Sequence, residues 1–356
     1  MQSAIRRTPQ VIRLDGSAVG SATTAVRIPL KKESLMADHL IRVQATQNFG
    51  SAGSVAIPTS CDPRNFIHDV SIETSDGRRV FATGYQVIDL SRFFEPGWTN
   101  PIFYAGTTSA VAATMDFDFI VHHANDGALH DMMAAIDASK LNTFDLVVNF
   151  NTDATNGFAV GGGVNGSGST VAAAYTVTCR SLGYPDMVDY SKYPENEKWV
   201  ESMRHVVESQ QKASTAGAGT SFDLRLTSGN KTRALMLHAF DTSGTLPAPA
   251  NTIINNVSLV INGQQIRQTT FPEVQKQNVR RRSFGTFNGT AALTGVLNSM
   301  VAIPGVAVID FGDDEAGWLD LRGVNEPILT VDVGSQGSLP ASYTIQLAQD
   351  YNIVMK

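Results

Sequence analysis

The chain has 356 residues, a length that allows two or three domains. Apolar residues make up 42% and charged residues only 17%, against about 25% in an ordinary protein, which excludes a disordered chain and a coiled coil. The net charge of −6 argues against a globally basic nucleic-acid-binding protein. Because interface cores are depleted in charged residues, the low charge suggests that partners cover much of the exterior.

Short runs of alternating apolar and polar residues recur along the chain, and clusters of Gly, Pro, Asn and Asp separate them. Many short strands with turn signals between them predict a β-sandwich or barrel. In chain order, the predicted strands are 26–30, 40–43, 70–72, 117–121, 144–148, 222–226, 235–237, 257–261, 306–309 and 328–331.

Helical spacing of apolar residues is rare. Residues 128–140 and 195–212 each carry apolar residues on one side at helical spacing, so we expect a helix in each. Residues 213–219 are small and rich in Gly, Ala and Ser, a composition typical of a flexible segment. The best domain boundary therefore lies within residues 183–220.

Three further features bear on the environment of the chain. Cys61 and Cys179 are far apart and too few for a disulfide framework, so we expect buried free thiols and synthesis in a reducing compartment. No apolar run follows the first seven residues, so we expect no secretory signal. Residues 283–309 carry no charge, but asparagines, glycines and a proline interrupt them, which favours a loop and strands over a membrane span.

The two halves of the sequence resemble each other. Residues 69–80 align with residues 256–266 as a strand, an Asp-Gly or Asn-Gly turn, and a second strand. The offset between matched segments falls steadily along the chain, as expected for two related domains of which the second has shorter loops. The other matches, in the same order, are 26–28 with 224–226, 40–43 with 235–237, and 174–178 with 342–346.

This pattern resembles the double jelly-roll major capsid proteins of tailless icosahedral viruses, including bacteriophages with an internal membrane. The resemblance covers about residues 20–356 and rests on the tandem β units, the linker, the helix between late strands, and the turns at Asp76-Gly77 and Asn262-Gly263. It implies an all-β fold of two tandem eight-stranded jelly rolls with a few short helices. The implied parts are an N-terminal basic arm (1–20), a first jelly roll (21–183), a linker with a helix (184–220) and a second jelly roll (221–356).

The resemblance also implies a function. The chain would be a structural protein and not an enzyme, made in the host cytoplasm, whose homotrimers of pseudo-hexagonal outline tile the icosahedral shell of a virion. Its partners would be further copies of itself, penton proteins and minor capsid proteins, with no cofactor. Jelly rolls protect most of their edges within two sheets, and lattice contacts bury much side surface, so few charges are needed.

A basic N-terminal arm fits the same family. Arg6, Arg7 and Arg13 precede the first acidic residue, Asp15. Such an arm could reach an internal lipid membrane or the packaged genome, at about 1 kcal/mol per basic residue near an anionic membrane. The alternative is a disordered, solvated tail.

Two motifs suggest ligand chemistry but fail on context. Residues 161–166 match Gly-x-Gly-x-x-Gly, yet no helix pattern follows, so we expect a flexible loop rather than a dinucleotide site. One dense group of potential metal ligands lacks any metalloenzyme spacing, which favours surface and interface histidines over a zinc site. This group is His122, His123, Asp126, His130 and Asp131.

Two charged clusters remain. Asp310, Asp313, Asp314 and Glu315 could hold Ca²⁺ through carboxylate oxygens, but the EF-hand spacing is absent, so we favour a solvated turn or helix start. The three arginines at 280–282 could contact phosphate, a neighbouring subunit's carboxylates or solvent. With no Gly-x-Ser-x-Gly elbow and no distinct carboxylate pair, we expect no catalytic, cofactor or metal site.

Two other functions are weighed against the capsid reading. A carbohydrate- or receptor-binding β protein, such as a spike or a tandem lectin, would need aromatic platforms, and Trp98, Trp199 and Trp318 are scattered. A tandem cupin-type enzyme would need His-x-His followed by Glu and His, an arrangement that the sequence lacks.

Overall fold

The structure is a computed structural model that describes residues 10–20, 25–32, 35–48, 63–94, 112–123, 135–151, 170–184, 203–215, 221–244, 247–287, 300–312, 317–334 and 339–354. The chain divides into two compact units. Unit 1 comprises Met1–Ser91, Gly97–Glu208 and Asn352–Lys356, and unit 2 comprises Arg92–Pro96 and Ser209–Tyr351.

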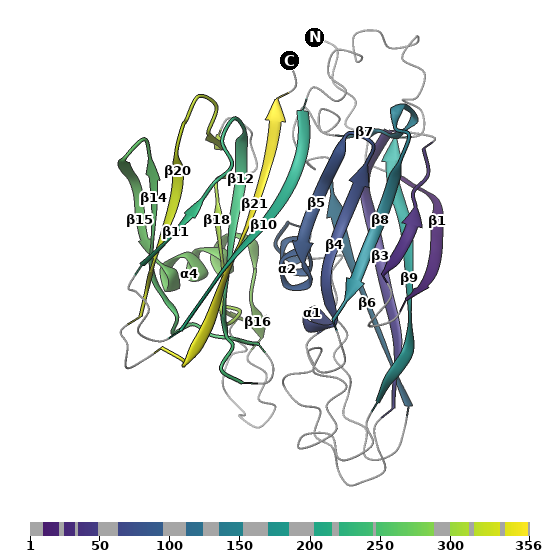
Figure 1. Cartoon of the computed structure of the whole chain (residues 1–356), viewed down its shortest axis with the longest axis horizontal. Coiled ribbons are helices and arrows are strands. Elements are labelled where there is room, and N and C mark those ends of the chain that lie inside the picture. The colour runs from purple at the N-terminus through teal and green to yellow at the C-terminus, as the bar shows by residue number, and fades with distance from the viewer. Residues whose placement is uncertain are drawn as a thin grey trace. The chain divides into compact units, whose positions relative to one another are not determined.

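Unit 1 is built on two sets of four antiparallel strands, which Figure 1 shows in purple to teal. The first set has the order β1-β9-β3-β6, with the short β7 (Ile136–Asp137) also on β3, and the second has the order β5-β4-β8-β2. Their bounds are β1 (Gln10–Gly20), β2 (Val26–Pro29), β3 (Leu35–Asn48), β4 (Ile67–Thr74), β5 (Gly77–Thr83), β6 (Ala112–His122), β8 (Phe144–Phe150) and β9 (Thr170–Tyr184).

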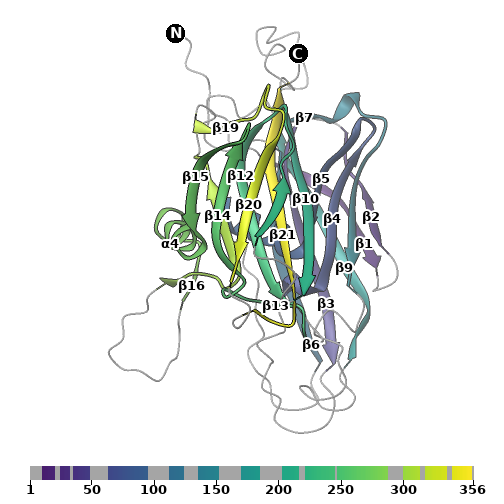
Figure 2. The ribbon, with the colours of Figure 1, turned by 60° about the vertical axis from the view of Figure 1, so that its left-hand side comes forward.

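The strands of unit 2, which Figure 2 draws mostly in green to yellow, form two sets in the corresponding order. The first residues of β10, up to Glu208, and the last of β21, from Asn352, belong to unit 1. One set has the order β10-β21-β12-β18 and the other β11-β20-β14-β15, while β13 (Ala248–Pro249) and β19 (Leu319–Asp320) add to β12. Their bounds are β10 (Met203–Thr215), β11 (Ser221–Arg225), β12 (Lys231–Asp241), β14 (Ile254–Ile261), β15 (Gln264–Thr270), β18 (Val306–Asp310), β20 (Pro327–Val333) and β21 (Ser342–Val354). A separate pair joins β16 (Thr286–Phe287) to β17 (Met300–Val301).

Each unit is therefore an eight-stranded jelly roll, because the chain alternates between its two sheets in the same order in both. The all-β double jelly roll expected from the sequence is confirmed. The ladder also corrects one match: Val26 pairs with Val148 and Phe222 pairs with Val331, so 26–28 lies level with 222–224 and not with 224–226. The matched strands are right, but the sequence alignment within them is displaced by two residues, which is one period of the pleat.

The strands form because their apolar residues alternate. Along β2 buried and exposed side chains alternate strictly, and along β20 buried residues alternate with half-buried ones. The matched residues Tyr175 and Tyr343 are only 1% and 0% exposed, so they occupy equivalent core positions in the two rolls. Each fully buried aliphatic or aromatic side chain contributes roughly 1.5–3 kcal/mol to stability.

A helix follows the same hairpin in each roll. The turn between β4 and β5 has Gly77 at φ 125°, and the turn between β14 and β15 has Asn262 at 49° and Gly263 at 75°. These left-handed values explain the Asp-Gly and Asn-Gly dipeptides. Helix α2 (Gly84–Phe94) then follows β5, and α4 (Phe271–Arg282) follows β15.

Both helices begin with a threonine capping box. The Gln86 backbone N–H donates to Thr83 Oγ1 (3.4 Å) and the Thr83 N–H donates to Gln86 Oε1 (3.0 Å). In α4 the Glu273 N–H donates to Thr270 Oγ1 (3.3 Å), and the Thr270 N–H donates to Glu273 Oε2 (3.1 Å). The sequence analysis missed both helices, although Thr-x-x-Gln and Thr-x-x-Glu after a strand are the signal for them.

Each helix is also tied to the next long strand at the same position relative to its cap. The Ile120 N–H of β6 donates to Ser91 Oγ (2.9 Å), and the Val308 N–H of β18 donates to Asn278 Oδ1 (2.8 Å). Asn278 Nδ2 in turn donates to the Val308 carbonyl (2.7 Å). The two rolls therefore share their topology and also the way in which the helix is fixed.

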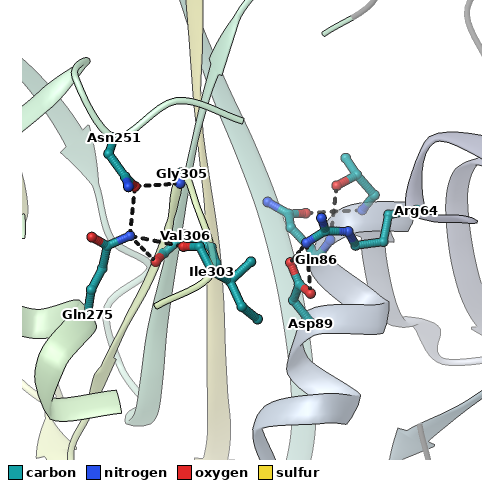
Figure 3. Close-up of polar contacts among 9 residues, drawn as sticks. Arg64, Gln86, Asp89, Asn251, Gln275, Ile303, Gly305 and Val306 are labelled. Carbon is teal, nitrogen blue, oxygen red and sulfur yellow. Dashed lines mark hydrogen bonds and ion pairs between the residues drawn. The ribbon is translucent and has the colours of Figure 1, made fainter. Parts of the chain in front are cut away.

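Further buried polar contacts fix each helix (Figure 3). In unit 1, Arg64 of α1 (Pro63–Phe66) forms an ion pair with the fully buried Asp89 of α2 (2.9 Å). In unit 2, the side-chain amide of Gln275 donates to Asn251 Oδ1 (2.9 Å) and to the carbonyls of Ile303 and Val306 (both 3.0 Å). Such contacts satisfy groups that would otherwise be buried without hydrogen bonds.

The expected helices differ from the observed ones. Residues 203–212, expected to be helical, lie in β10, because strand pairing overrides a weak amphipathic pattern. Of residues 128–140, those from 136 onward form β7 and a single 3₁₀ turn, η1 (Ala138–Lys140), and residues 128–134 lie outside the described residues. Among the described helices, none is long and apolar enough to cross a membrane.

Candidate functional site

The predicted basic arm is only partly described. Gln10–Gly20 forms strand β1, which pairs with β9, so the part of the expected arm from Gln10 onward is a strand of the first roll. Arg13 lies within this strand, opposite Ser181. Arg6 and Arg7 lie outside the described residues.

The histidines expected at the surface are largely buried. His122 Nδ1 lies 3.0 Å from Asp38 Oδ1, and His123 is only 1% exposed. The interpretation as surface or interface histidines is therefore wrong for His123, because the end of β6 turns this side chain into the core. Asp126, His130 and Asp131 lie outside the described residues.

Three buried imidazole rings follow one another in unit 1. The ring centroids of His39 and His123 are 5.1 Å apart, and those of His123 and His205 are 6.3 Å apart. Burial lowers the pKa of His123 well below its ordinary value, and His39, His205 and Arg79 lower this pKa further. Burial also lowers the pKa of His39, against the opposing effect of Asp15 and Asp38. Burial therefore favours the neutral forms of His39 and His123.

A group of three potential metal ligands lies on adjacent strands of the same sheet. One ligand atom from each of Asp15 (β1), His39 (β3) and Cys179 (β9) lies within 4.8 Å of the other two. Cys179 is a buried free thiol, as expected from the sequence, and burial raises its pKa well above the ordinary value. Cys61 lies outside the described residues. Sequence reasoning missed this group because strand pairing, not spacing along the chain, brings the three residues together.

The arginine run and the acidic cluster meet in unit 2. Arg282 Nη2 lies 2.8 Å from Asp310 Oδ2, so the partner of this arginine belongs to its own chain. The exposed Arg280 and Arg281 end α4, where positive charge interacts favourably with the helix dipole. Asp313, Asp314 and Glu315 lie outside the described residues, so the calcium alternative is untested.

The outward faces of unit 1 carry paired charges. Arg27 of β2 lies 2.7 Å from Asp145 and 2.8 Å from Glu73. On the other sheet, Arg42 forms an ion pair with Asp116, and its hydrogen bonds lower the pKa of that carboxyl. Exposed pairs of this kind contribute about 0–1 kcal/mol each, so they shape the surface more than they stabilise the fold.

Edge strands carry the exposed apolar residues. Among the described residues, the large hydrophobic side chains with high exposure are Val19 (64%) and Ile266 (51%). Val19 lies on β1 and Ile266 on β15, and each strand is the last in its sheet order. An unpaired edge strand with an apolar, uncharged side chain is suited to contact with another chain.

The features that would favour a sugar-binding or dinucleotide site lack support among the described residues. Trp318 is buried and its indole N–H donates to the Gly312 carbonyl (3.0 Å), so this ring is not an exposed platform. Trp98, Trp199 and the glycine-rich residues 161–166 lie outside the described residues.

No family model and no curated protein matches the chain. Solved structures match nearly its whole length, among them the following three. A chain of Sulfolobus Turreted Icosahedral Virus has a TM-score of 0.66 at 12% identity, covering 97% of this chain and 90% of that one. The major capsid protein P2 from Bacteriophage PM2 has a TM-score of 0.52 at 11% identity, covering 97% and 96%. The Faustovirus major capsid protein has a TM-score of 0.55 at 8% identity, covering 100% and 93%. The chain therefore has the double jelly-roll fold of viral major capsid proteins.

Proposed function

We propose that this chain is a major capsid protein, a structural and non-enzymatic subunit of an icosahedral virion. The observation that carries the proposal is the coverage of the structural likeness: chains named as major capsid proteins match this chain over 97% and 100% of its length. A likeness to one roll alone would fit any β-sandwich. A likeness to both rolls supports a building role.

The physical properties of the chain support the same role. A shell subunit contacts neighbours on several sides, and obligate interfaces bury above about 2,000 Å². Such surfaces need few charges, which agrees with a charged fraction of 17%. Some charged side chains on the sheet faces are paired within the chain, as Arg27 is with Asp145.

The finer proposal is a homotrimer. Two similar rolls per chain give six similar rolls in three copies, and a six-sided outline packs efficiently in a closed lattice. Penton proteins and minor capsid proteins would fill the positions that a six-sided unit cannot. We further propose synthesis in the host cytoplasm, a bacterial host and an internal membrane; the likeness to the protein from Bacteriophage PM2 supports the bacterial host alone.

The test is the state of the purified full-length chain. We expect sedimentation velocity to show a species of three chains, and electron microscopy of concentrated protein to show six-sided particles or shells. A chain that stays monomeric at high concentration would overturn the proposal. Binding of glycans by that monomer would instead support the receptor-binding alternative.

The N-terminal arm is a separate part of the proposal. Arg6 and Arg7 precede β1, and with Arg13 they would contact an anionic membrane or the packaged genome. We expect Arg6→Gln/Arg7→Gln to weaken binding to anionic vesicles or to DNA, and to reduce the salt dependence of that binding. Lys212→Gln/Arg225→Gln removes the same charge from exposed positions in unit 2 and serves as the control. Equal binding by both variants would show that the arm contacts neither.

A further inference from the structure

We propose that Asp15, His39 and Cys179 form a binding site for a thiophilic divalent cation of the zinc class inside the first jelly roll. The ligand atoms of the three side chains lie within 4.8 Å of one another. In a tetrahedral zinc site with metal–ligand bonds of about 2.0–2.3 Å, ligand atoms are roughly 3.3–3.8 Å apart. Contraction by about 1–1.5 Å would bring the three ligand atoms to these distances, with a water molecule in the fourth position of the tetrahedron.

The strand register brings the three residues together. His39 lies opposite Ser181, and Ile41 and Gly16 lie on either side of Cys179 across the two ladders. The β1–β9 register shifts between Leu14 and Gly16, so Asp15 stands at a bulge. A bulge redirects a side chain out of the regular alternation, and bulges are common next to functional sites.

Hydrogen bonds already hold two of the ligands. The Ser181 hydroxyl donates its hydrogen to Asp15, so its oxygen accepts from His39 Nδ1, 3.1 Å away. The Lys31 backbone N–H donates to the other Asp15 oxygen (2.9 Å). These bonds restrict the carboxylate and the imidazole before any ion binds, and such restraint raises affinity.

A buried imidazole nitrogen gives an independent indication of a ligand. His39 is 0% exposed, and its Nε2 has no hydrogen-bond partner among the described residues. With its Nδ1–H donating to Ser181, His39 has its free lone pair on Nε2, which is therefore the nitrogen that would bind the metal. A metal-bound histidine ordinarily donates its other N–H in this way.

The donor set selects the metal. A thiolate and an imidazole favour zinc and its neighbours over Mg²⁺ or Ca²⁺, which prefer oxygen. The thiolate of Cys179 and the carboxylate of Asp15 together neutralise a divalent ion, so the buried complex carries no net charge. Binding forms bonds from the metal to Sγ, a carboxylate oxygen and Nε2, and it releases one proton, that of the Cys179 thiol.

A catalytic role for the same residues has less support. Cys, His and Asp also form nucleophilic sites, but Cys179 is 0% exposed, and burial raises the pKa of its thiol. A thiol that stays protonated and is closed to substrate is a poor nucleophile. Metal binding removes the thiol proton and requires access by an ion alone.

The experiment uses Co²⁺ as the probe on the full-length chain after treatment with a chelator. We expect about one Co²⁺ per chain, a sulfur-to-cobalt charge-transfer band, release of about one proton per ion, and displacement by Zn²⁺. Cys179→Ser should lose the band, and Asp15→Asn should weaken binding at least tenfold. His68→Gln, which removes an exposed histidine beside Asp69 in the same unit, should bind as the parent does.

Circular dichroism separates a lost site from a lost fold. Zn²⁺ should raise the melting temperature of the parent chain and of His68→Gln, but not that of folded Cys179→Ser. If Cys179→Ser does not fold, the proton release and the charge-transfer band of the parent decide the matter. Absence of that band in the parent, or its persistence in Cys179→Ser, would overturn the proposal. Neither result bears on assembly, which sedimentation measures separately.

Discussion

Burial of the His39 and His123 rings in one core makes the first roll sensitive to acid. The pKa of His123 is lowered by burial and by its neighbours His39, His205, Arg79 and His122. An unfolded histidine has a pKa of about 6.5. The unfolded chain therefore binds a proton below this pH that the folded chain excludes, so stability is complete above about pH 6.5 and falls as the pH drops further.

We expect the free energy of unfolding, measured with a chelator present, to be constant near pH 7–8 and to fall below pH 6.5 by roughly 1.4 kcal/mol per pH unit for each excluded proton. His123→Leu should reduce this slope, because the side chain no longer titrates. Gln277→Ala, which removes no titratable group at an exposed site, should leave the slope unchanged. Denaturant titrations between pH 5 and 8 measure the slope. An unchanged slope in His123→Leu would show that the buried His123 ring is not its cause.

At the scale of elements, one polar side chain of the helix after each hairpin bonds it to the next long strand. Asn278→Ala removes both hydrogen bonds between Asn278 and Val308 and leaves a buried N–H and a buried carbonyl unpaired. An unpaired buried group costs about 1–3 kcal/mol. We expect Asn278→Ala to lower the unfolding free energy by about 2–4 kcal/mol.

Ser91→Ala removes the equivalent single bond from Ile120 in the first roll, so we expect a loss of about 1–2 kcal/mol. Gln277→Ala, an exposed position on α4, should change stability by less than about 0.5 kcal/mol. Urea titrations of the three variants measure these differences. A loss in Asn278→Ala no greater than that in Gln277→Ala would show that these hydrogen bonds do not hold the helix.

The elements also show what the sequence could predict. Strands such as β2 and β20 were predictable because one face of each is buried, which imposes a period of two. Helices α2 and α4 were missed because their caps, Thr83 and Thr270, were not read as start signals. The Asp15 group could not be predicted, because it depends on pairing between β1, β3 and β9, which are remote in sequence.

At the scale of the whole molecule, the repeat of one roll explains why a few short matched segments in the sequence were enough to predict the fold of the whole chain. Two rolls of one topology need the same turns, caps and core positions twice, and the repeat of Tyr175 and Tyr343 in the core reflects this. Identities of 8–12% with structures of the same fold show that patterning, rather than particular residues, maintains it.

The edge strands β1 and β15 are where we expect assembly to be most sensitive. Val19 and Ile266 expose 64% and 51% of their surface, so a charge at either position costs the fold little. A charge on an edge strand does, however, oppose contact with another chain. We therefore expect Val19→Asp and Ile266→Asp to reduce the assembled fraction in sedimentation velocity at least several-fold, with melting temperatures within a few degrees of the parent.

Ser228→Asp places the same charge in an exposed loop and should assemble normally. If both edge variants assemble as the parent does, the contacts between copies use the faces of the rolls instead of these edges.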